Sequence, residues 1–177
     1  MTMPPGLKST SSPIQISSSI VQTATNAFIS TEIDLTLNVL DNEVFVVTQL
    51  NIDVDAPDYP AAGLEVASVD ASLSTTQRPS VGGINDQNVL GSAQRRIVVD
   101  LAAPGASASF DREDPLFAAI SEDYLGIVAT NNMFLNMNTE GLAAGKLKAT
   151  RVRVYGYRAT ASSATYAALV QSELLSA

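Results

Sequence analysis

Apolar and polar residues alternate one by one along much of this chain. The stretch TEIDLTLNVL (31–40) places four apolar side chains at every second position, and residues 44–54 carry a longer apolar series of the same kind. A period of two is the pattern of a strand with one buried face. The short polar turn DNE (41–43) lies between the two runs. The pattern therefore predicts an antiparallel hairpin over 31–54.

Six further runs have the composition of strands and bring the predicted number to eight. In one of them, 64–73, the apolar positions change parity, which predicts a bulge near Ala67–Ser68. Long stretches rich in Gly, Pro, Asp and Ser separate the runs and predict loops. The six runs are 14–21, 64–73, 95–101, 124–129, 133–137 and 146–158, and the loops are 55–63, 75–88 and 103–115.

Two segments have helical features. DPLFAAISEDY (114–124) begins with Asp114 as a capping residue and Pro115 at the first helical position, which predicts one short inserted helix. The tail after Ser163 places apolar residues on one stripe of a helix, so a short C-terminal helix is expected there with Ser163 as its cap.

These elements predict an all-β fold: an eight-stranded antiparallel β-sandwich with the inserted helix and the C-terminal helix. An immunoglobulin-type sandwich and an irregular barrel are alternatives, but the Cys–Trp–Cys signature of antibody-type domains is missing. Eight strands with long loops favour the jelly roll. The predicted organisation is a flexible N-terminal arm (1–13), the jelly-roll β-sandwich (14–159) and a C-terminal helical tail (160–177).

The amino-acid composition excludes several kinds of catalytic and metal site. Hydrophobic residues make up 46% of the 177 residues and charged residues 16%, which is typical of a folded domain with a full core. The chain contains no Cys, no His and no Trp, which excludes disulfides, Cys-based zinc sites and Ser–His triads. No SxxK, GxSxG or complete phosphate loop occurs. We therefore expect no enzymatic activity, no catalytic residue and no small-molecule substrate.

Acidic residues gather in NIDVDAPDYP, where Asp53, Asp55 and Asp58 lie at the end of a predicted strand. Oxygen ligands that lie close together suit calcium. An EF-hand beginning at Asp53 would need glycine at position 58 and glutamate at position 64, and the chain has Asp58 and Leu64. Two interpretations stay open: a loose calcium site, which is the one cofactor the sequence suggests, or solvated loop carboxylates.

Positive charge gathers in one late segment, KLKATRVRVYGYRAT (146–160). The net charge is −8 overall, −12 over residues 1–145 and +4 from residue 146 onward. A strand of this kind could attract acids of another copy, lie solvated on the surface, or contact nucleic acid through its interleaved Arg and Tyr residues. The acidic chain as a whole disfavours nucleic acid, so self-association is preferred. The interface candidates are Lys146, Lys148, Arg151, Arg153 and Arg158, facing Asp111, Glu113 and Asp114 of a neighbouring copy.

The Ser- and Pro-rich start MTMPPGLKSTSSP, the series of strands and the tail DYLGIVATNNMFLNM…KLKATRVRVYGYRATASSATYAALVQSELLSA together resemble single jelly-roll capsid proteins of small icosahedral viruses, marine prokaryotic viruses in particular. The resemblance is best over about the last 55 residues and looser over 31–54. It implies a structural protein of the virion, made in the host cytoplasm, that assembles in many copies into an icosahedral shell.

The resemblance also implies partners. Terminal arms of such proteins reach neighbouring copies, and many of these arms are strongly basic and hold the genome. Here the first 30 residues contain one basic residue, Lys8. Genome contact by the arm is therefore doubtful, which favours an internal membrane, a second capsid or spike protein, or polyamines facing the genome. The alternative function is a receptor- or carbohydrate-binding β-sandwich module of a phage fibre or spike, stabilised by calcium at the Asp53–Asp58 segment.

Overall fold

The computed structural model describes residues 6–102, 107–112, 116–118 and 124–175. Within them the chain forms eleven strands, one short 3-10 helix and one α-helix. Eight of the strands are six residues or longer, and three are only three residues long. The elements are β1 Leu7–Ser9, β2 Ile14–Val21, β3 Ile29–Asp34, η1 Val39–Asp41, β4 Glu43–Val54, β5 Val66–Ser74, β6 Val89–Asp100, β7 Ser107–Arg112, β8 Leu116–Ala118, β9 Gly126–Val128, β10 Asn132–Glu140, β11 Ala149–Ala161 and α1 Ser163–Leu175.

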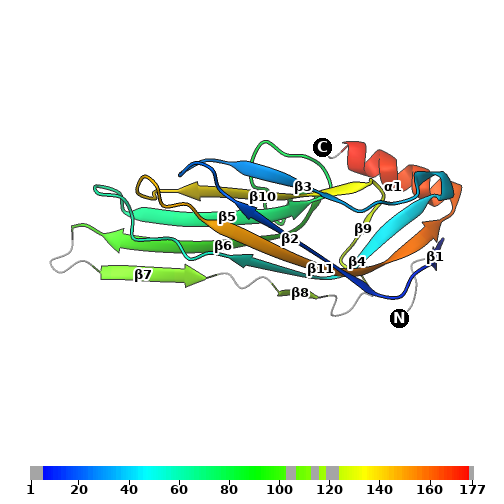
Figure 1. Ribbon diagram of the computed structural model, residues 1–177, viewed down its shortest axis with the longest axis horizontal. Helices are drawn as coiled ribbons and strands as arrows, with labels where there is room; N and C mark the ends of the chain where they lie inside the picture. Colours follow the sequence, from blue (N-terminus) through cyan, green and yellow to red (C-terminus); the bar gives the residue numbers. More distant parts are fainter. Residues whose placement is uncertain (1–5, 103–106, 113–115, 119–123, 176–177) are drawn as a thin grey trace.

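The strands form two antiparallel sheets that lie face to face along the long axis of the molecule (Figure 1). In sheet A, β11 lies between β4 on one side and β1 and β2 on the other, and β8 and β9 pair with β4. Sheet B has the order β3-β10-β5-β6-β7. The pairing is nested, because β2 pairs with β11, β3 with β10, β4 with β8 and β9, and β5 with β6. A long hairpin rolled into two sheets has this connectivity, so the predicted jelly roll is confirmed.

The main core fills the space between the sheets. Alternate residues of each long strand point into it, as the period of two requires. Fully buried side chains come from β4 and β11 in sheet A and from β5 and β10 in sheet B, and each contributes about 1.5–3 kcal/mol through removal from water. They include Leu50, Ile52, Val152, Val154, Val69, Leu73, Met133, Leu135 and Met137.

The predicted hairpin over 31–54 is wrong. β3 pairs with β10 in sheet B, whereas β4 pairs with β11 in sheet A, so the segment 35–42 crosses from one sheet to the other. Leu35 and Leu37 are buried in this crossover. Their alternation therefore arises from a link that passes over the end of the core and not from a longer strand.

The inserted helix predicted at 114–124 is also wrong over 116–118, where β8 pairs with residues 49–51 of β4. Pairing satisfies backbone groups along the edge of β4 that would otherwise lack partners. Residues 113–115 and 119–123 lie outside the described part of the chain, and so do Glu113 and Asp114. The neighbouring stretch 107–112, assigned to a loop from the sequence, forms β7 on the edge of sheet B.

Two further local predictions differ from the structure. The arm 1–13 is not flexible throughout, because Leu7–Ser9 pairs with Ala159–Ala161 of β11. The bulge expected near Ala67–Ser68 is absent, and the register of β5 against β6 shifts instead between Leu73 and Ser74. The change of parity has another cause: β5 is buried on both faces, so a side chain of either parity can be buried along it.

The predicted C-terminal helix is confirmed as α1. Its cap is Ser162 and not Ser163, since the Ser162 hydroxyl accepts the N–H of Thr165 at 3.2 Å. α1 packs through Tyr166, Leu169 and Val170 on a second apolar cluster at one end of sheet A, which contains Val44, Val46, Tyr157 and Ala159. Over the part of the chain that the structure describes, no helix has the length and apolar character to cross a membrane.

Candidate functional site

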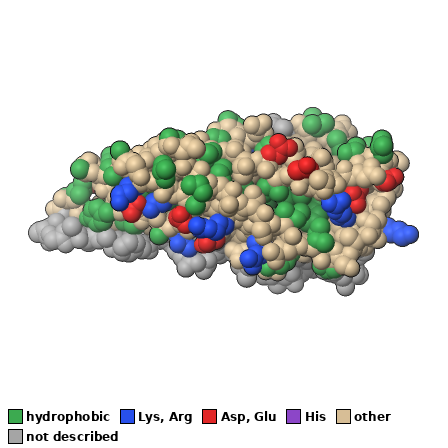
Figure 2. Space-filling view, in the orientation of Figure 1, with side chains coloured by type: hydrophobic (Ala, Val, Ile, Leu, Met, Phe, Trp, Pro, Cys, Tyr) green, Lys and Arg blue, Asp and Glu red, His purple; other side chains and the backbone are tan. Residues whose placement is uncertain are grey.

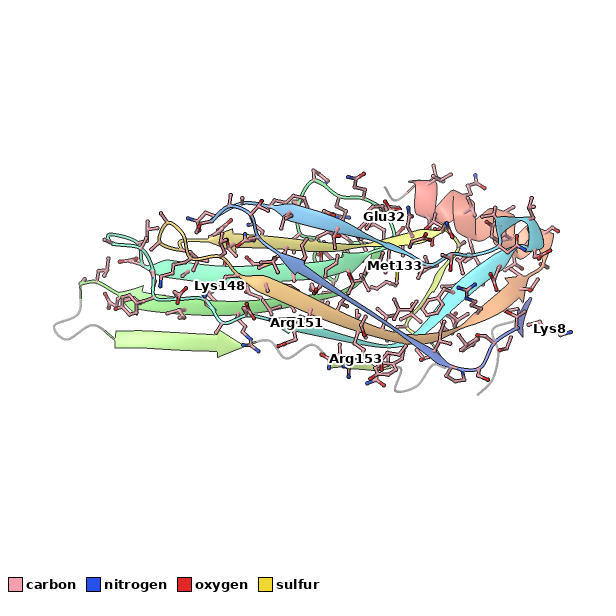
Figure 3. The ribbon with its side chains drawn as sticks, viewed as in Figure 1. Lys8, Glu32, Met133, Lys148, Arg151 and Arg153 are labelled. Atoms are coloured by element: carbon pink, nitrogen blue, oxygen red, sulfur yellow. The ribbon has the colours of Figure 1, made fainter. Side chains whose placement is uncertain are left out.

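The basic segment lies in the middle of sheet A. On β11, Val152 and Val154 face the core, while Arg151 and Arg153 face outward (Figure 3). The outward pair has polar neighbours on both sides, because Arg151 lies opposite Ser19 and Asp53, and Arg153 lies opposite Ser17 and Asn51. These residues line a shallow polar groove across β2, β11 and β4.

Arg151 and Lys148 of the basic segment form ion pairs with carboxylates of the same chain. The Arg151 guanidinium lies 3.0 Å from a carboxylate oxygen of Asp55 and 3.7 Å from one of Asp53. The hydrogen bond to Asp55 raises the pKa of Arg151. Lys148 lies 2.7 Å from Asp58, and this contact lowers the pKa of the Asp58 carboxyl. The cations predicted for a subunit interface and the carboxylates predicted for calcium therefore contact one another.

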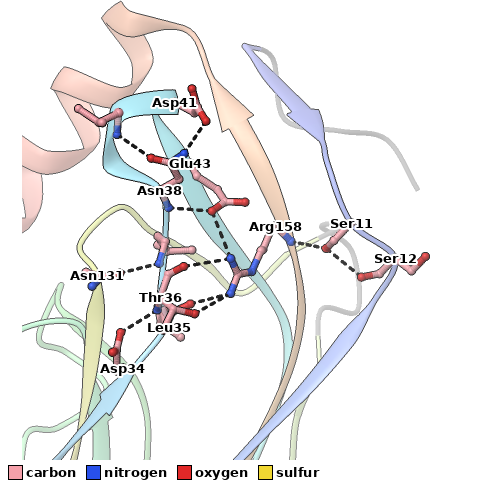
Figure 4. Close-up of polar contacts among 12 residues, drawn as sticks. Ser11, Ser12, Asp34, Leu35, Thr36, Asn38, Asp41, Glu43, Asn131 and Arg158 are labelled. Atoms are coloured by element: carbon pink, nitrogen blue, oxygen red, sulfur yellow. Dashed lines mark hydrogen bonds and ion pairs between the residues drawn. The ribbon is translucent and has the colours of Figure 1, made fainter.

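Arg158 has a structural role at the crossover between the sheets (Figure 4). Its Nη2 donates to the Leu35 carbonyl at 2.8 Å and to the Thr36 hydroxyl at 3.0 Å. Its Nη1 donates to the Thr36 carbonyl at 3.1 Å and lies 3.3 Å from a Glu43 carboxylate oxygen. Thr36 has φ +49°, in the left-handed region, so these bonds hold a turn that the backbone alone disfavours.

Two of the five predicted interface cations, Lys146 and Arg153, have no ion pair with any described residue. Of the acids expected to face them, Asp111 belongs to β7 and its backbone lies opposite Arg96 of β6. Glu113 and Asp114 lie outside the described residues. The contact between these cations and acids on neighbouring copies stays a prediction.

The three carboxylates of the predicted calcium site are spread over different partners. Asp53 lies 3.4 Å from Arg95 of sheet B, and Asp55 accepts the backbone N–H of Ala149 as well as its bond from Arg151. Among the described residues, no three acidic, His or Cys side chains come close enough to hold a metal ion together. The arrangement favours ion pairs over a metal centre.

Adding calcium should therefore leave the melting temperature unchanged. A calcium ion would have to displace Lys148 from Asp58 and Arg151 from Asp55 before it gained their oxygens. Thermal unfolding in millimolar calcium, compared with excess chelator, measures this. A calcium-dependent rise in Tm that disappears in Asp58→Asn would contradict the prediction and restore the calcium site.

The sequence did not indicate the importance of α1 and of the turn beside it. Leu174 and Leu175 are 67% and 79% exposed, and Leu40 in η1 is 94% exposed. The helix α1 lies at one end of the molecule (Figure 1), and hydrophobic side chains appear at the surface of this end in Figure 2. Together with Tyr166 and Val170, the two leucines form a surface that we call the α1 face. The helix sequence SATYAALVQSELL is apolar on more than one side, and this is the signal that could have revealed it.

Glu173 holds α1 in place. It is only 8% exposed, and its two carboxylate oxygens accept the backbone N–H groups of Ala129 and Thr130 at 3.0 Å each. The Tyr166 hydroxyl adds a bond to the Ala129 carbonyl at 3.3 Å. Glu173 is the single acidic residue from position 146 onward, and it connects the helix to the link between β9 and β10.

The sequence matches no known protein family and no curated protein. Two viral proteins are among the solved structures that are similar to it in fold. VP1 of Trichodysplasia spinulosa-associated polyomavirus, solved in complex with sialylated glycooligomers, is 7% identical with a TM-score of 0.36, and 92% of this chain and 98% of that chain are covered. A chain of Desmodium yellow mottle tymovirus is 13% identical with a TM-score of 0.27, covering 92% and 94%. Both scores are low, and the jelly-roll assignment rests on the strand pairing of this chain.

Proposed function

We propose that this chain is a structural capsid subunit that assembles in many copies into an icosahedral shell. The observation that carries the proposal is the exposed α1 face. Leu174 and Leu175 end a helix that is fixed to the sandwich by Glu173, so the apolar surface is held in a defined orientation. Exposed apolar patches of this kind mark surfaces for protein association.

A second copy of this chain is the occupant that fits best. Burying Leu174 and Leu175 would contribute about 1.5–3 kcal/mol for each side chain, and a shell repeats such a contact many times. Leu40 in η1 is a further exposed apolar side chain. The net charge of −8 makes copies repel at long range, which favours an apolar contact over a purely electrostatic one.

Electrostatic contacts add to this proposal in a smaller way. Arg153 and Lys146 would face acidic groups of a neighbouring copy, since their charges are not paired within the described chain. In the virion, a second capsid or spike protein, an internal membrane or polyamines would face the genome, because the N-terminal arm carries Lys8 as its single basic residue.

The purified protein should form large uniform particles, measured by light scattering and negative-stain microscopy. The double variant Leu174→Glu, Leu175→Glu should stay monomeric, because it places two charges in the contact. Val21→Glu is the matched control. Val21 is 60% exposed on β2, away from α1, so this variant should still form particles. Particles should also persist near about 1 M salt, where charge contacts are screened. A strict monomer under every condition would refute the proposal, and loss at high salt would move the contact to Arg153 and Lys146.

A further inference from the structure

The outer face of sheet B is mostly polar across the middle of β5 and β10. β5 directs Ser68, Asp70, Ser72 and Ser74 outward, and β10 beside it directs Asn136 and Asn138 outward. Ser72, Ser74 and Asn136 are fully buried, because the loop 75–88 folds back over them. The Gly82 N–H donates to the Ser72 hydroxyl at 3.0 Å, and the Asn136 amide donates to the Ser74 hydroxyl at 2.9 Å.

A groove of about 480 Å³ remains open beside this loop. Its floor is a row across three strands, in which Asn138 of β10 lies opposite Asp70 of β5 and Asp70 lies opposite Gln94 of β6. Phe28 closes one end of the row, one residue before the strand β3 that pairs with β10. The loop residues 80–83 form the other wall. Phe28 lines the groove and does not belong to either apolar core cluster.

The central carboxylate is not neutralised by any described residue. Asp70 accepts hydrogen bonds from the Ser68 hydroxyl at 2.9 Å and from the Gln94 side-chain amide, both of which are neutral. The nearby Arg78 is bound to Asp86 at 2.8 Å and to Asn88, within the loop. A carboxylate keeps further acceptor positions after two bonds, whereas the amides of Asn138 and Gln94 can both donate and accept.

This set of groups fits a neutral sugar. Neighbouring hydroxyls of a hexose are donors to a carboxylate and partners for side-chain amides, and an aromatic ring covers the apolar C–H face of the pyranose. Among the described residues that line the groove, Asp70 is the one that is charged, so an anionic ligand such as a sialylated glycan or a phosphate would meet repulsion. A lone carboxylate also provides too few ligands for a metal ion.

We propose that the groove between sheet B and the loop 75–88 binds a neutral hexose, as a free sugar or as the terminal unit of a glycan. The inference is independent of assembly, because the groove lies on sheet B and the α1 face lies at one end of sheet A. A protein that failed to form particles could still bind the sugar, and the reverse is equally true.

The test uses the full chain and two probe sets. The first is a panel of free galactose, glucose, mannose and N-acetylglucosamine, followed by saturation-transfer NMR and calorimetry. The second is an array of neutral and sialylated glycans. We expect binding to at least one neutral sugar and no preference for sialylated glycans. Binding to free sugars identifies a monosaccharide ligand, and binding on the neutral array alone identifies a terminal unit of a glycan.

Substitutions in and outside the groove test where the sugar binds. Asp70→Asn and Phe28→Ala should each weaken it by about tenfold or more, since each removes one contact type from the row. Glu32→Gln changes an exposed acid of the same sheet outside the groove and should have no effect. If Asp70→Asn does not fold, Ser80→Tyr on the exposed loop blocks the groove instead and should abolish binding. Absence of neutral-sugar binding, binding that all these variants retain, or selective binding of sialylated glycans would each overturn the proposal.

Discussion

Replacing Glu173 by Ala should destabilise the protein by about 3 kcal/mol, because two backbone N–H groups, one buried and one partly buried, lose a charged acceptor. These two N–H groups belong to Ala129 and Thr130, which lie beneath α1. For a chain of this size the melting temperature should fall by roughly 6–12 °C. Urea unfolding followed by circular dichroism measures the change.

Gln171→Ala is the matched control for this variant. Gln171 lies two residues earlier on the same helix and is exposed, so its removal should change stability by less than about 0.5 kcal/mol. The Glu173 variant should also lose particles at temperatures where the sandwich is still folded, since α1 would no longer be held at Ala129. Equal stability of Glu173→Ala and Gln171→Ala would show that the carboxylate does not hold the helix.

The same residue gives stability a dependence on pH. Burial raises the pKa of Glu173 above its ordinary value of 4.5, and the N–H groups of Ala129 and Thr130 oppose this rise in part. Between the unfolded pKa of Glu173 and its higher folded pKa, the folded state therefore binds more protons than the unfolded state. The stability that comes from protonated Glu173 is present at low pH and is lost as the pH rises through the folded pKa. Wild type should lose stability relative to Glu173→Gln as the pH rises above 4.5. A difference that grows in the opposite direction would contradict the burial of a charged carboxylate here.

Replacing Gly141 by Ala should destabilise the protein by about 4 kcal/mol. Gly141 follows β10 with φ +69°, a conformation that costs about 1 kcal/mol for other residues. A Cβ at this position would lie 1.9 Å from the Val66 carbonyl oxygen, which is backbone of β5 and cannot move without disturbing the sheet. The clash adds about 3 kcal/mol. Denaturant unfolding measures the sum.

Gly145→Ala separates the cost of the backbone conformation from the cost of the clash. Gly145 lies in the same loop with φ +81°, and a Cβ there would have no atom within 4 Å. This variant should therefore lose about 1 kcal/mol from the backbone conformation alone. Equal losses in the two variants would mean that the loop moves away from Val66 without penalty.

Local patterns in the sequence predicted several elements well because their causes are local. The alternation in β4 and β11 shows which side chains are buried, and the apolar stripe after Ser163 predicts α1. The pairing of these strands could be predicted less well from the sequence. Residues 31–54 contain a strand, a polar turn and a strand, yet β3 and β4 belong to different sheets. Pairing depends on the closure of the whole nested hairpin, and that is not encoded at a turn.

The candidate sites depended even more on long-range contacts. The sequence predicted that Arg151 and Asp55 would matter, but it assigned one to a subunit interface and the other to calcium, and they are hydrogen-bonded to each other across 96 positions of the chain. The Asp70 groove could not be predicted, because its floor combines β10, β5 and β6 and its wall is a folded loop.

The sequence by itself determined the class of fold, the C-terminal helix, the absence of His and Cys chemistry and the uneven distribution of charge, since each depends on composition or on a period of two to four residues. Only the tertiary structure decided which charges meet, which apolar side chains stay exposed on α1 and where a polar groove opens. Those features arise when sheet pairing brings distant segments within hydrogen-bond range, and the free energy of that pairing belongs to the closed sandwich as a whole.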